Sequence, residues 1–252
     1  MPALLEIEDI HTYFSTNEGI VKAVNGISLS LHENRVLGVV GESGSGKTMT
    51  ALSILQLVPF PGDVVKGKIT YDGKDLLNMP VSQLRQIRGK EISLIFQDAG
   101  AALNPVISVG KQVEELMLEH TDMSKRQARA FAAELLSQMG IPDANKMLDR
   151  YPFQLSGGMA QRVLLAIGVA LKPRILIADE PTSNLDVTLQ AEILHRLRRL
   201  REENGTAIML ITHDLGVIAQ MAEMVAVMYG GSIVEYADTL TLYRRHMHPY
   251  TW

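Results

Sequence analysis

The chemistry of this sequence is most concentrated in one glycine-rich run. Its residues are, in order, Gly41, Glu42, Ser43, Gly44, Ser45, Gly46, Lys47 and Thr48. Glycines let a backbone wrap tightly with its N–H groups pointing inward, which forms an anion-binding nest at the start of a helix. The lysine adds a positive charge for the outer phosphates, and the threonine hydroxyl can ligate Mg²⁺. Because a strand-like run at 36–40 precedes it and a helix-like segment at 49–57 follows, the pattern predicts a P-loop for a nucleoside triphosphate.

A second candidate site stands at the end of an apolar, strand-like run at 175–178. The run leads into Asp179 and Glu180, and open α/β sheets bind ligands at the carboxyl ends of their strands. Asp179 can hold Mg²⁺ through water, because this ion usually keeps part of its hydration shell. Glu180 is then the candidate base that orients the attacking water. Beside a P-loop, the two carboxylates predict hydrolysis of the bound nucleotide.

A third motif lies about one helix-length before the strand that carries Asp179. Residues 155–162 contain Ser156, Gly157 and Gly158 ahead of an apolar helix expected over 163–171. A hydroxyl, a flexible backbone and a helix N-terminus again suit an anion. Since the glycine-rich run already supplies one phosphate cradle, the second one predicts a second nucleotide contact. A head-to-tail dimer would use such a contact.

The elements that must position these motifs are strands in the first part of the chain. Strands are expected at 4–10 and 23–31, with a loop between them that contains Tyr13 and Phe14. The segment 59–67 is rich in turn residues. Further strands are expected at 68–71, 91–96 (ending at Gln97), 174–178, 207–212 (ending at His213) and 224–229. The long apolar runs among them are typical of a central parallel sheet.

The pattern changes from strands to helices between residues 98 and 162. Ser124 and Gln127 have the spacing of a capping box at a helix start. Phe131, Leu135 and Met139 then form an apolar stripe, which packing explains better than a cofactor does. We therefore expect a helical lobe inserted into an α/β core.

Composition narrows the class of protein further. The chain has 252 residues, with 24 Lys and Arg against 28 Asp and Glu, so its net charge of −4 gives no electrostatic reason to expect nucleic acid. The absence of cysteine excludes disulfides, thiolate metal sites and a cysteine nucleophile. The acidic N-terminus does not fit a secretory signal, and no apolar run approaches the roughly 20 residues that cross a bilayer.

With these motifs in place, the sequence resembles the ATP-binding subunits of ABC transporters over nearly its whole length. Residues 41–48 are similar to the Walker A motif, 155–162 to the signature motif and 175–180 to Walker B. Gln97 falls at the Q-loop position and His213 matches the switch histidine. The run 183–186 is similar to the D-loop, although the family more often has a small residue where Asn184 stands.

The resemblance implies one ABC ATPase domain over 1–252. Its fold is an α/β P-loop NTPase core with an N-terminal antiparallel β subdomain and an inserted α-helical subdomain. The core is expected at about 1–97 and 163–240, the helical subdomain at about 98–162 and a C-terminal tail at about 241–252.

The resemblance also implies roles for single residues in a site that binds ATP and Mg²⁺. Phe14 would stack on adenine, with Tyr13 as the alternative ring. Thr48, Gln97 and Asp179 would hold the metal. The catalytic group is expected to comprise Lys47, Gln97, Glu180 and His213, and the partner's Ser156, Gly157 and Gly158 would close over the γ-phosphate.

Finer details resemble the branch that imports oligopeptides, dipeptides and nickel, notably residues 103–105 and the ending 248–251. This implies a peripheral subunit on the cytoplasmic face of the inner membrane. Its partners would be permease subunits, a second ATP-binding subunit (identical or paralogous) and, indirectly, an extracytoplasmic substrate-binding protein. Two rivals are a soluble ABC ATPase acting on DNA or ribosomes and a regulatory module without turnover. The transported substrate is not specified by these residues.

Overall fold

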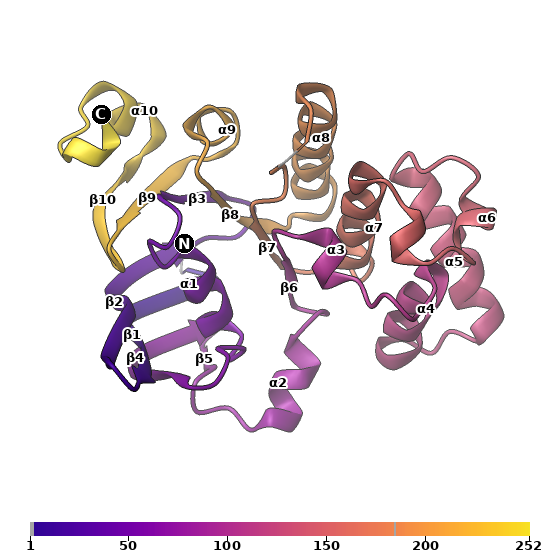
Figure 1. The fold of residues 1–252 in the computed structure, drawn as a ribbon, viewed down its shortest axis with the longest axis horizontal. Helices are drawn as coiled ribbons and strands as arrows, with labels where there is room; N and C mark the ends of the chain where they lie inside the picture. Colours follow the sequence, from indigo (N-terminus) through magenta and orange to yellow (C-terminus); the bar gives the residue numbers. More distant parts are fainter. Residues whose placement is uncertain (1–2, 184) are drawn as a thin grey trace.

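The described residues fold around two β-sheets, and a group of helices lies to one side of them (Figure 1). The computed structural model describes residues 3–183 and 185–252, so Asn184 of the D-loop run lies outside the described residues. The first sheet is antiparallel, in the order β2-β1-β4-β5, and the second has the order β10-β9-β3-β8-β7-β6. The strands are β1 (Leu5–Thr16), β2 (Gly19–Leu31), β3 (Val36–Gly41), β4 (Gly62–Tyr71), β5 (Lys74–Asp75), β6 (Ile92–Ile95), β7 (Ile175–Asp179), β8 (Ala207–Thr212), β9 (Met224–Tyr229) and β10 (Ser232–Asp238).

The second sheet holds the strands that lead into the predicted site residues, and its central strands are parallel. β3 pairs in parallel with β8 and β9, and β7 pairs in parallel with β6 and β8. β3, β7 and β8 are buried along their whole length, as their continuous apolar sequences predict. Their carboxyl ends therefore meet at one edge of the sheet, the edge where open α/β sheets bind ligands.

Helices cover the second sheet and also form the group at the right of Figure 1. They are α1 (Lys47–Ile54), α2 (Val81–Ile87), α3 (Ala99–Ala102), α4 (Val109–His120), α5 (Lys125–Gln138), α6 (Ala144–Met147), α7 (Gly157–Val169), α8 (Val187–Asn204), α9 (Leu215–Met221) and α10 (Thr239–Arg244), with short 3₁₀ turns η1 (Pro152–Gln154) and η2 (Pro249–Thr251). α5 begins with the predicted capping box, in which the Ser124 N–H donates to Gln127 Oε1 at 2.9 Å. No helix of the described residues is both long and apolar enough to span a bilayer.

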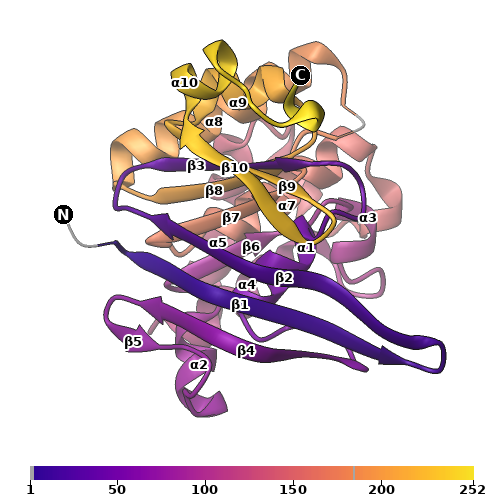
Figure 2. The ribbon, with the colours of Figure 1, turned by 90° about the vertical axis from the view of Figure 1, so that its left-hand side faces the viewer.

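Two apolar cores lie on opposite faces of the parallel sheet. Successive side chains of a strand point to opposite faces, so Val36 and Val40 of β3 enter one core while Leu37 and Val39 enter the other. The core that contains Val36 and Val40 is covered by α4, α5, α7, α8 and α9. The core that contains Leu37 and Val39 is covered by the antiparallel sheet and α1. Figure 2 shows β2, β1 and β4 side by side, with β10 next to β2.

Three sequence expectations need correction. Tyr13 and Phe14 lie in β1 and not in a loop, and β4 begins at Gly62, inside the segment expected to be turns. These two strand ends pair with each other, Phe14 opposite Gly62, and their exposure removes the apolar alternation that marks a strand. The helix expected at 163–171 begins earlier, at Gly157, so the predicted subdomain boundary at 162 falls inside α7. The division into subdomains stays a prediction.

Candidate functional site

The glycine-rich run forms the turn between β3 and α1, where two glycines make contacts that a side chain would prevent. A Cβ on Gly41 would lie 2.3 Å from the Met228 carbonyl oxygen, and one on Gly46 would lie 2.3 Å from the Ala23 carbonyl oxygen. Gly46 also has φ of 102°, a backbone conformation that favours glycine. Neighbouring strands β2 and β9 thus press against the loop and fix its path ahead of α1.

Lys47 is folded into this loop. Its Nζ donates to the carbonyl oxygens of Gly41 at 2.7 Å and Glu42 at 2.9 Å, and the residue is only 7% exposed. Burial lowers the pKa of the Lys47 ammonium, while the negative charges of Glu180 and Asp179 oppose the shift. The loop therefore holds a partly desolvated cation, which attracts phosphate oxygens, while the two nearby carboxylates would require a metal cation before a triphosphate could lie beside them.

Asp179 ends β7 as a buried carboxylate that is short of partners. The residue is 2% exposed, and its Oδ1 accepts no hydrogen bond from any described residue. Burial raises the pKa of this carboxyl, while the Thr48 hydroxyl and the Lys47 charge act in the opposite direction. A buried carboxylate oxygen left unpaired is costly, and a divalent cation with its water shell would satisfy it.

Glu180 follows Asp179 and is held by the end of the neighbouring strand. His213 Nδ1 lies 2.8 Å from Glu180 Oε1, with Glu180 buried and the His213 side chain 65% exposed. The Glu180 N–H donates to the Ile211 carbonyl of β8 at 2.9 Å. Glu180 has φ of 50°, a left-handed conformation that is strained for a residue with a Cβ.

Two predicted site residues make no side-chain hydrogen bond to the described residues of the group above. Gln97 is exposed and lies two residues after the end of β6 at Ile95. Phe14 is half-buried on β1 and its ring packs over Gly62, where a Cβ would come within 2.5 Å of the ring. The Tyr13 hydroxyl, by contrast, donates to Asn25 Oδ1 at 2.7 Å. That bond links Tyr13 of β1 to β2, and the choice of Phe14 over Tyr13 as the stacking ring stays a prediction.

The signature residues form a separate hollow at the start of α7. Ser156 is the N-cap, and its Oγ accepts from the Met159 N–H at 3.3 Å. The hollow measures about 420 Å³ and is lined by Ser156, Gly157, Gly158, Met159, Arg162, Leu185, Asp186 and Leu189. Among the described residues, none of the hydrogen bonds links this hollow to residues 41–48. The described part of the chain thus holds two candidate anion-binding places that no hydrogen bond joins.

A contact that sequence reasoning missed joins α7 to the strand end. Gln161 is 6% exposed, and its Nε2 donates to the Pro181 carbonyl at 2.9 Å. Arg162, its neighbour, pairs with Glu192 of α8 at 2.6 Å. The available signal was a glutamine among apolar helix positions, which marks a buried polar group that needs a partner.

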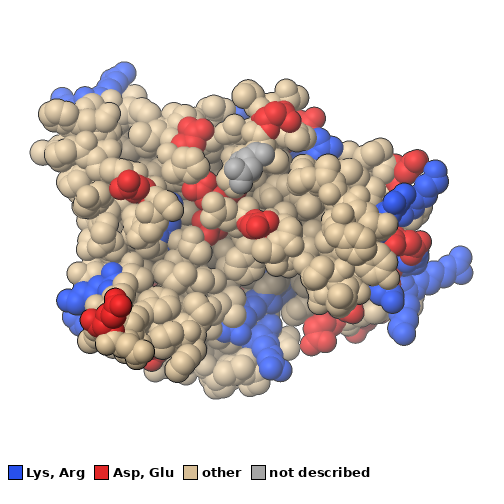
Figure 3. All heavy atoms as spheres, viewed as in Figure 1, with Lys and Arg blue, Asp and Glu red and all other residues tan. Residues whose placement is uncertain are grey.

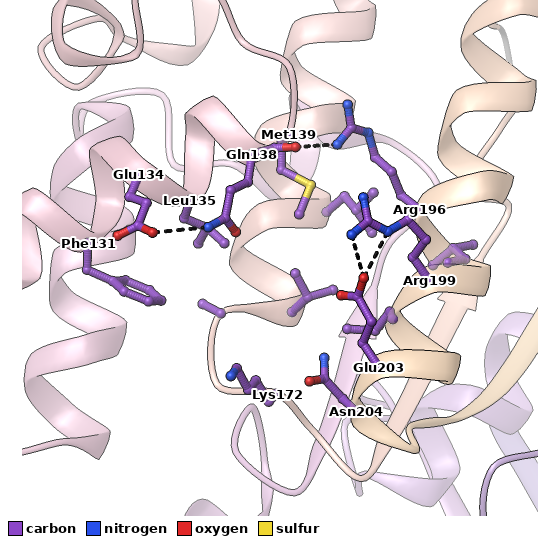
Figure 4. Close-up of a pocket in the computed structure, with 15 residues that line it drawn as sticks. Phe131, Glu134, Leu135, Gln138, Met139, Lys172, Arg196, Arg199, Glu203 and Asn204 are labelled. Carbon is purple, nitrogen blue, oxygen red and sulfur yellow. Dashed lines mark hydrogen bonds and ion pairs between the residues drawn. The ribbon is translucent and has the colours of Figure 1, made fainter.

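A larger hollow of about 650 Å³ lies between α5, α7 and α8 and is not part of the candidate site (Figure 4). Lys172 and Asn204 line it, and these residues precede β7 and β8 at the amino ends of the strands. Arg199 and Glu203 pair across its rim at 2.9 Å. In the space-filling view, acidic side chains lie in the middle of the face while Lys and Arg lie mainly along its margins (Figure 3).

A strand–loop–helix phosphate cradle with carboxylates from a neighbouring parallel strand defines the class of P-loop nucleotide-binding proteins. The sequence matches the protein family described as ABC transporter over residues 24–183, and the chain belongs to that family. It is 45% identical to the oligopeptide transport ATP-binding protein OppD of Bacillus subtilis (strain 168) over 250 residues, 99% of this chain and 70% of that protein. It is also 45% identical to the dipeptide transport ATP-binding protein DppD of Lactococcus lactis subsp. cremoris (strain MG1363), over 99% of this chain and 72% of that protein.

Solved structures give the same result for the fold. The dimeric, post-hydrolysis structure of the ATP-binding cassette MJ0796 bound to ADP and Pi matches with a TM-score of 0.84 at 26% identity, over 93% of this chain and 98% of that one. The structure of cbiO1 from Clostridium perfringens, at 23% identity, matches with a TM-score of 0.77 over 97% of this chain and 92% of that one, which supports the fold alone. The family and fold class predicted from the motifs are confirmed, as is the prediction of an ATPase subunit that powers transport.

Proposed function

We propose that this chain is the ATP-hydrolysing subunit of a peptide importer, and that it works as one half of a dimer on membrane permease subunits. The observation that carries the proposal is the meeting of Lys47, Asp179 and Glu180 at one edge of the parallel sheet, with His213 bonded to Glu180. This group contains a cation for phosphates, a buried acid for a metal and a second acid for water.

Phosphate binding follows from the loop around Lys47. The N–H groups at a helix start bind phosphate, so the triphosphate would lie along the loop ahead of α1 with its outer phosphates at Lys47. Phe14 and the adjoining strand ends supply the apolar surface for the base. Phosphoryl transfer asks mainly for such positioning and for charge stabilisation.

Mg²⁺ fits the residues present, because Asp179 Oδ1 is buried and unsatisfied among the described residues and the Thr48 hydroxyl adjoins the same carboxyl. Asp179, Thr48 and Gln97 would hold the ion. When bound, it would neutralise charge on the phosphate oxygens. These oxygen donors are the kind that Mg²⁺ prefers.

Glu180 is the candidate base for the attacking water. Its carboxylate would accept the proton as the water oxygen attacks the γ-phosphorus and the bond to the β-phosphate oxygen breaks, with ADP as the leaving group. The hydrogen bond between His213 Nδ1 and Glu180 Oε1 would hold that carboxylate in one orientation. Because His213 is largely exposed, it can reach a γ-phosphate and sense whether it is present.

The hollow at Ser156, Gly157 and Gly158 supports a shared site. A second copy of the chain, or a paralogue, would place its signature motif over the nucleotide bound at this chain's Lys47. This chain's signature motif would cover the nucleotide bound to the partner in the same way. MJ0796 is described as a dimer. ATP would then hold the two halves together, and hydrolysis would release them.

Peptide as cargo rests on the names of the relatives, which are oligopeptide and dipeptide transport proteins. Nickel remains the second candidate from the sequence resemblance. The permease, and indirectly an extracytoplasmic binding protein, would select the substrate. The subunit would act at the cytoplasmic face of the inner membrane, and no feature of the site calls for nucleic acid.

Hydrolysis measured against protein concentration tests the proposal. We expect the wild-type rate to rise more steeply than linearly, because the site needs two chains. Glu180→Gln should abolish turnover and accumulate an ATP-stabilised dimer in size-exclusion chromatography. Glu203→Gln, on the exposed face of α8, is the matched control and should behave as wild type. A wild-type rate strictly proportional to concentration, or an active Glu180→Gln chain, would contradict the shared site or the base.

A further inference from the structure

The signature helix and the candidate base are linked by one buried hydrogen bond. Gln161 lies on α7, the helix that begins at Ser156, and its amide donates to the carbonyl of Pro181. Pro181 directly follows Glu180. Since the amide and the carbonyl are both shielded from water, breaking the bond leaves a buried acceptor unsatisfied.

Glu180 depends on such support, because its own backbone conformation is unfavourable. A left-handed backbone conformation is disfavoured for a residue with a Cβ, because the Cβ crowds the following carbonyl oxygen. The Glu180 N–H is held by Ile211, and its carbonyl accepts from Ser183 N at 3.2 Å and Ser183 Oγ at 3.0 Å. Gln161 holds the next carbonyl, at Pro181, so the peptide units around the strained residue are fixed from β8, from the following turn and from α7.

We propose that Gln161 is a positioning residue for Glu180, and that through it the helix carrying the signature for one nucleotide site orients the base of the other. The inference rests on the proposed function. Gln161 is remote from nucleotide in this scheme and acts through the Pro181 peptide. Without the Gln161 amide, the Glu180 carboxylate would still be present but would be less well oriented toward the attacking water. We therefore expect kcat to fall more than the affinity for ATP.

Two substitutions distinguish the hydrogen bond donated by the Gln161 amide from the space that its side chain fills. Gln161→Leu removes the donor, and we expect kcat to fall about tenfold with KM for ATP changed less than about twofold. Gln161→Glu keeps the shape, and its buried carboxyl can donate to Pro181 only when protonated, a form that burial favours. The activity of the Glu variant relative to wild type should therefore rise as pH is lowered, and that of the Leu variant should not.

Gln112→Leu is the matched control. The Gln112 amide also donates to backbone carbonyls, of Asn104 at 3.1 Å and Ile107 at 2.9 Å, but within the helical group and away from Glu180. We expect its kcat to match wild type. Thermal unfolding of both Leu variants shows whether either loses its fold. If Gln161→Leu does not fold, the pH profile of Gln161→Glu decides the question.

Mixed dimers show on which side the glutamine acts. One chain carries Glu180→Gln and a second affinity tag, so that only the site with the intact Glu180 can turn over. Gln161→Leu is then placed either in the chain with the intact Glu180 or in the chain that supplies Ser156 to that site. The rate of a single turnover at the intact site is measured, because ATP kept at the other site holds the dimer closed. We expect this rate to fall about tenfold in the first arrangement and to change little in the second.

The outcomes separate this inference from the proposed function. Loss that follows the chain supplying Ser156, or no loss in either arrangement, overturns the positioning role while hydrolysis by the mixed dimer still supports the ATPase. If the wild-type chain shows no ATP hydrolysis at any protein concentration, the shared-site function itself is wrong.

Discussion

The phosphate loop allows a sharp test with glycine-to-alanine substitutions. At Gly46, φ is 102° and a Cβ would lie 2.3 Å from the Ala23 carbonyl oxygen of β2, a backbone atom that cannot rotate away. At Gly44, φ is 81° but the space around a Cβ is open within 4 Å. The two positions thus share an unfavourable backbone conformation and differ in the contact. We predict that Gly46→Ala destabilises the fold far more than Gly44→Ala.

The magnitude follows from two contributions. Left-handed backbone costs alanine about 1–2 kcal/mol relative to glycine, and this applies at both sites. Forcing an extra methyl into a packed region adds about 1–3 kcal/mol, and this applies at Gly46 alone. The free energy of unfolding should therefore fall by about 2–5 kcal/mol for Gly46→Ala and about 1–2 kcal/mol for Gly44→Ala.

Urea unfolding of the two variants and wild type measures these differences. Gly205→Ala is a second control, because Gly205 caps α8 with φ of 70°, has open space at its Cβ and lies at the amino end of β8, away from the phosphate loop. It should match Gly44→Ala. Equal destabilisation at Gly44 and Gly46 would refute the reasoning, since the contact with Ala23 would then contribute nothing.

Two further predictions concern the carboxylates. The raised pKa of Asp179 means that the folded chain binds this proton more tightly than the unfolded chain, so stability falls as pH rises from about 4 through the folded pKa. Asp179→Asn should remove that fall. In urea unfolding between about pH 4 and 7, the free energy of unfolding of the variant should therefore rise relative to that of wild type as pH increases. A difference between the two free energies that does not change with pH would contradict the argument that Asp179 is a buried charge. His213→Ala removes the bond to Glu180 Oε1, and we expect kcat to drop about a hundredfold while the dissociation constant for a fluorescent ATP analogue stays nearly unchanged. An equal loss of binding would show that His213 serves the pocket and not the base.

The parts of the fold that depend on local sequence could be predicted. The continuous apolar runs of β3, β7 and β8 identify buried parallel strands, and Ser124 with Gln127 identifies the start of α5. These signals are local, because they lie in the residues of a single element.

The parts that were missed depend on partners far away in the sequence. The outer half of β1 pairs with β2 on one side, Phe14 opposite Val21, and with the distant β4 on the other, Phe14 opposite Gly62. The residue types at these positions do not signal the pairing with β4. The bond from Gln161 to Pro181 is of the same kind, since a buried glutamine shows that a partner is needed but not which one. Roles for Phe14 and Gln97 stay predictions that rest on the family resemblance.

The site concentrates features that a stable fold would avoid. Asp179 is a buried acid with an unpaired oxygen among the described residues, and Lys47 is a desolvated cation. Glu180 has a strained backbone. Each is unfavourable alone, and strain of this kind persists only where the surroundings over-determine it. Here β8, the turn at Ser183 and α7 provide that support from three directions. Because α7 also presents the signature, a partner that shifts this helix would shift the support of Glu180, so closure of one site can set the geometry of the other.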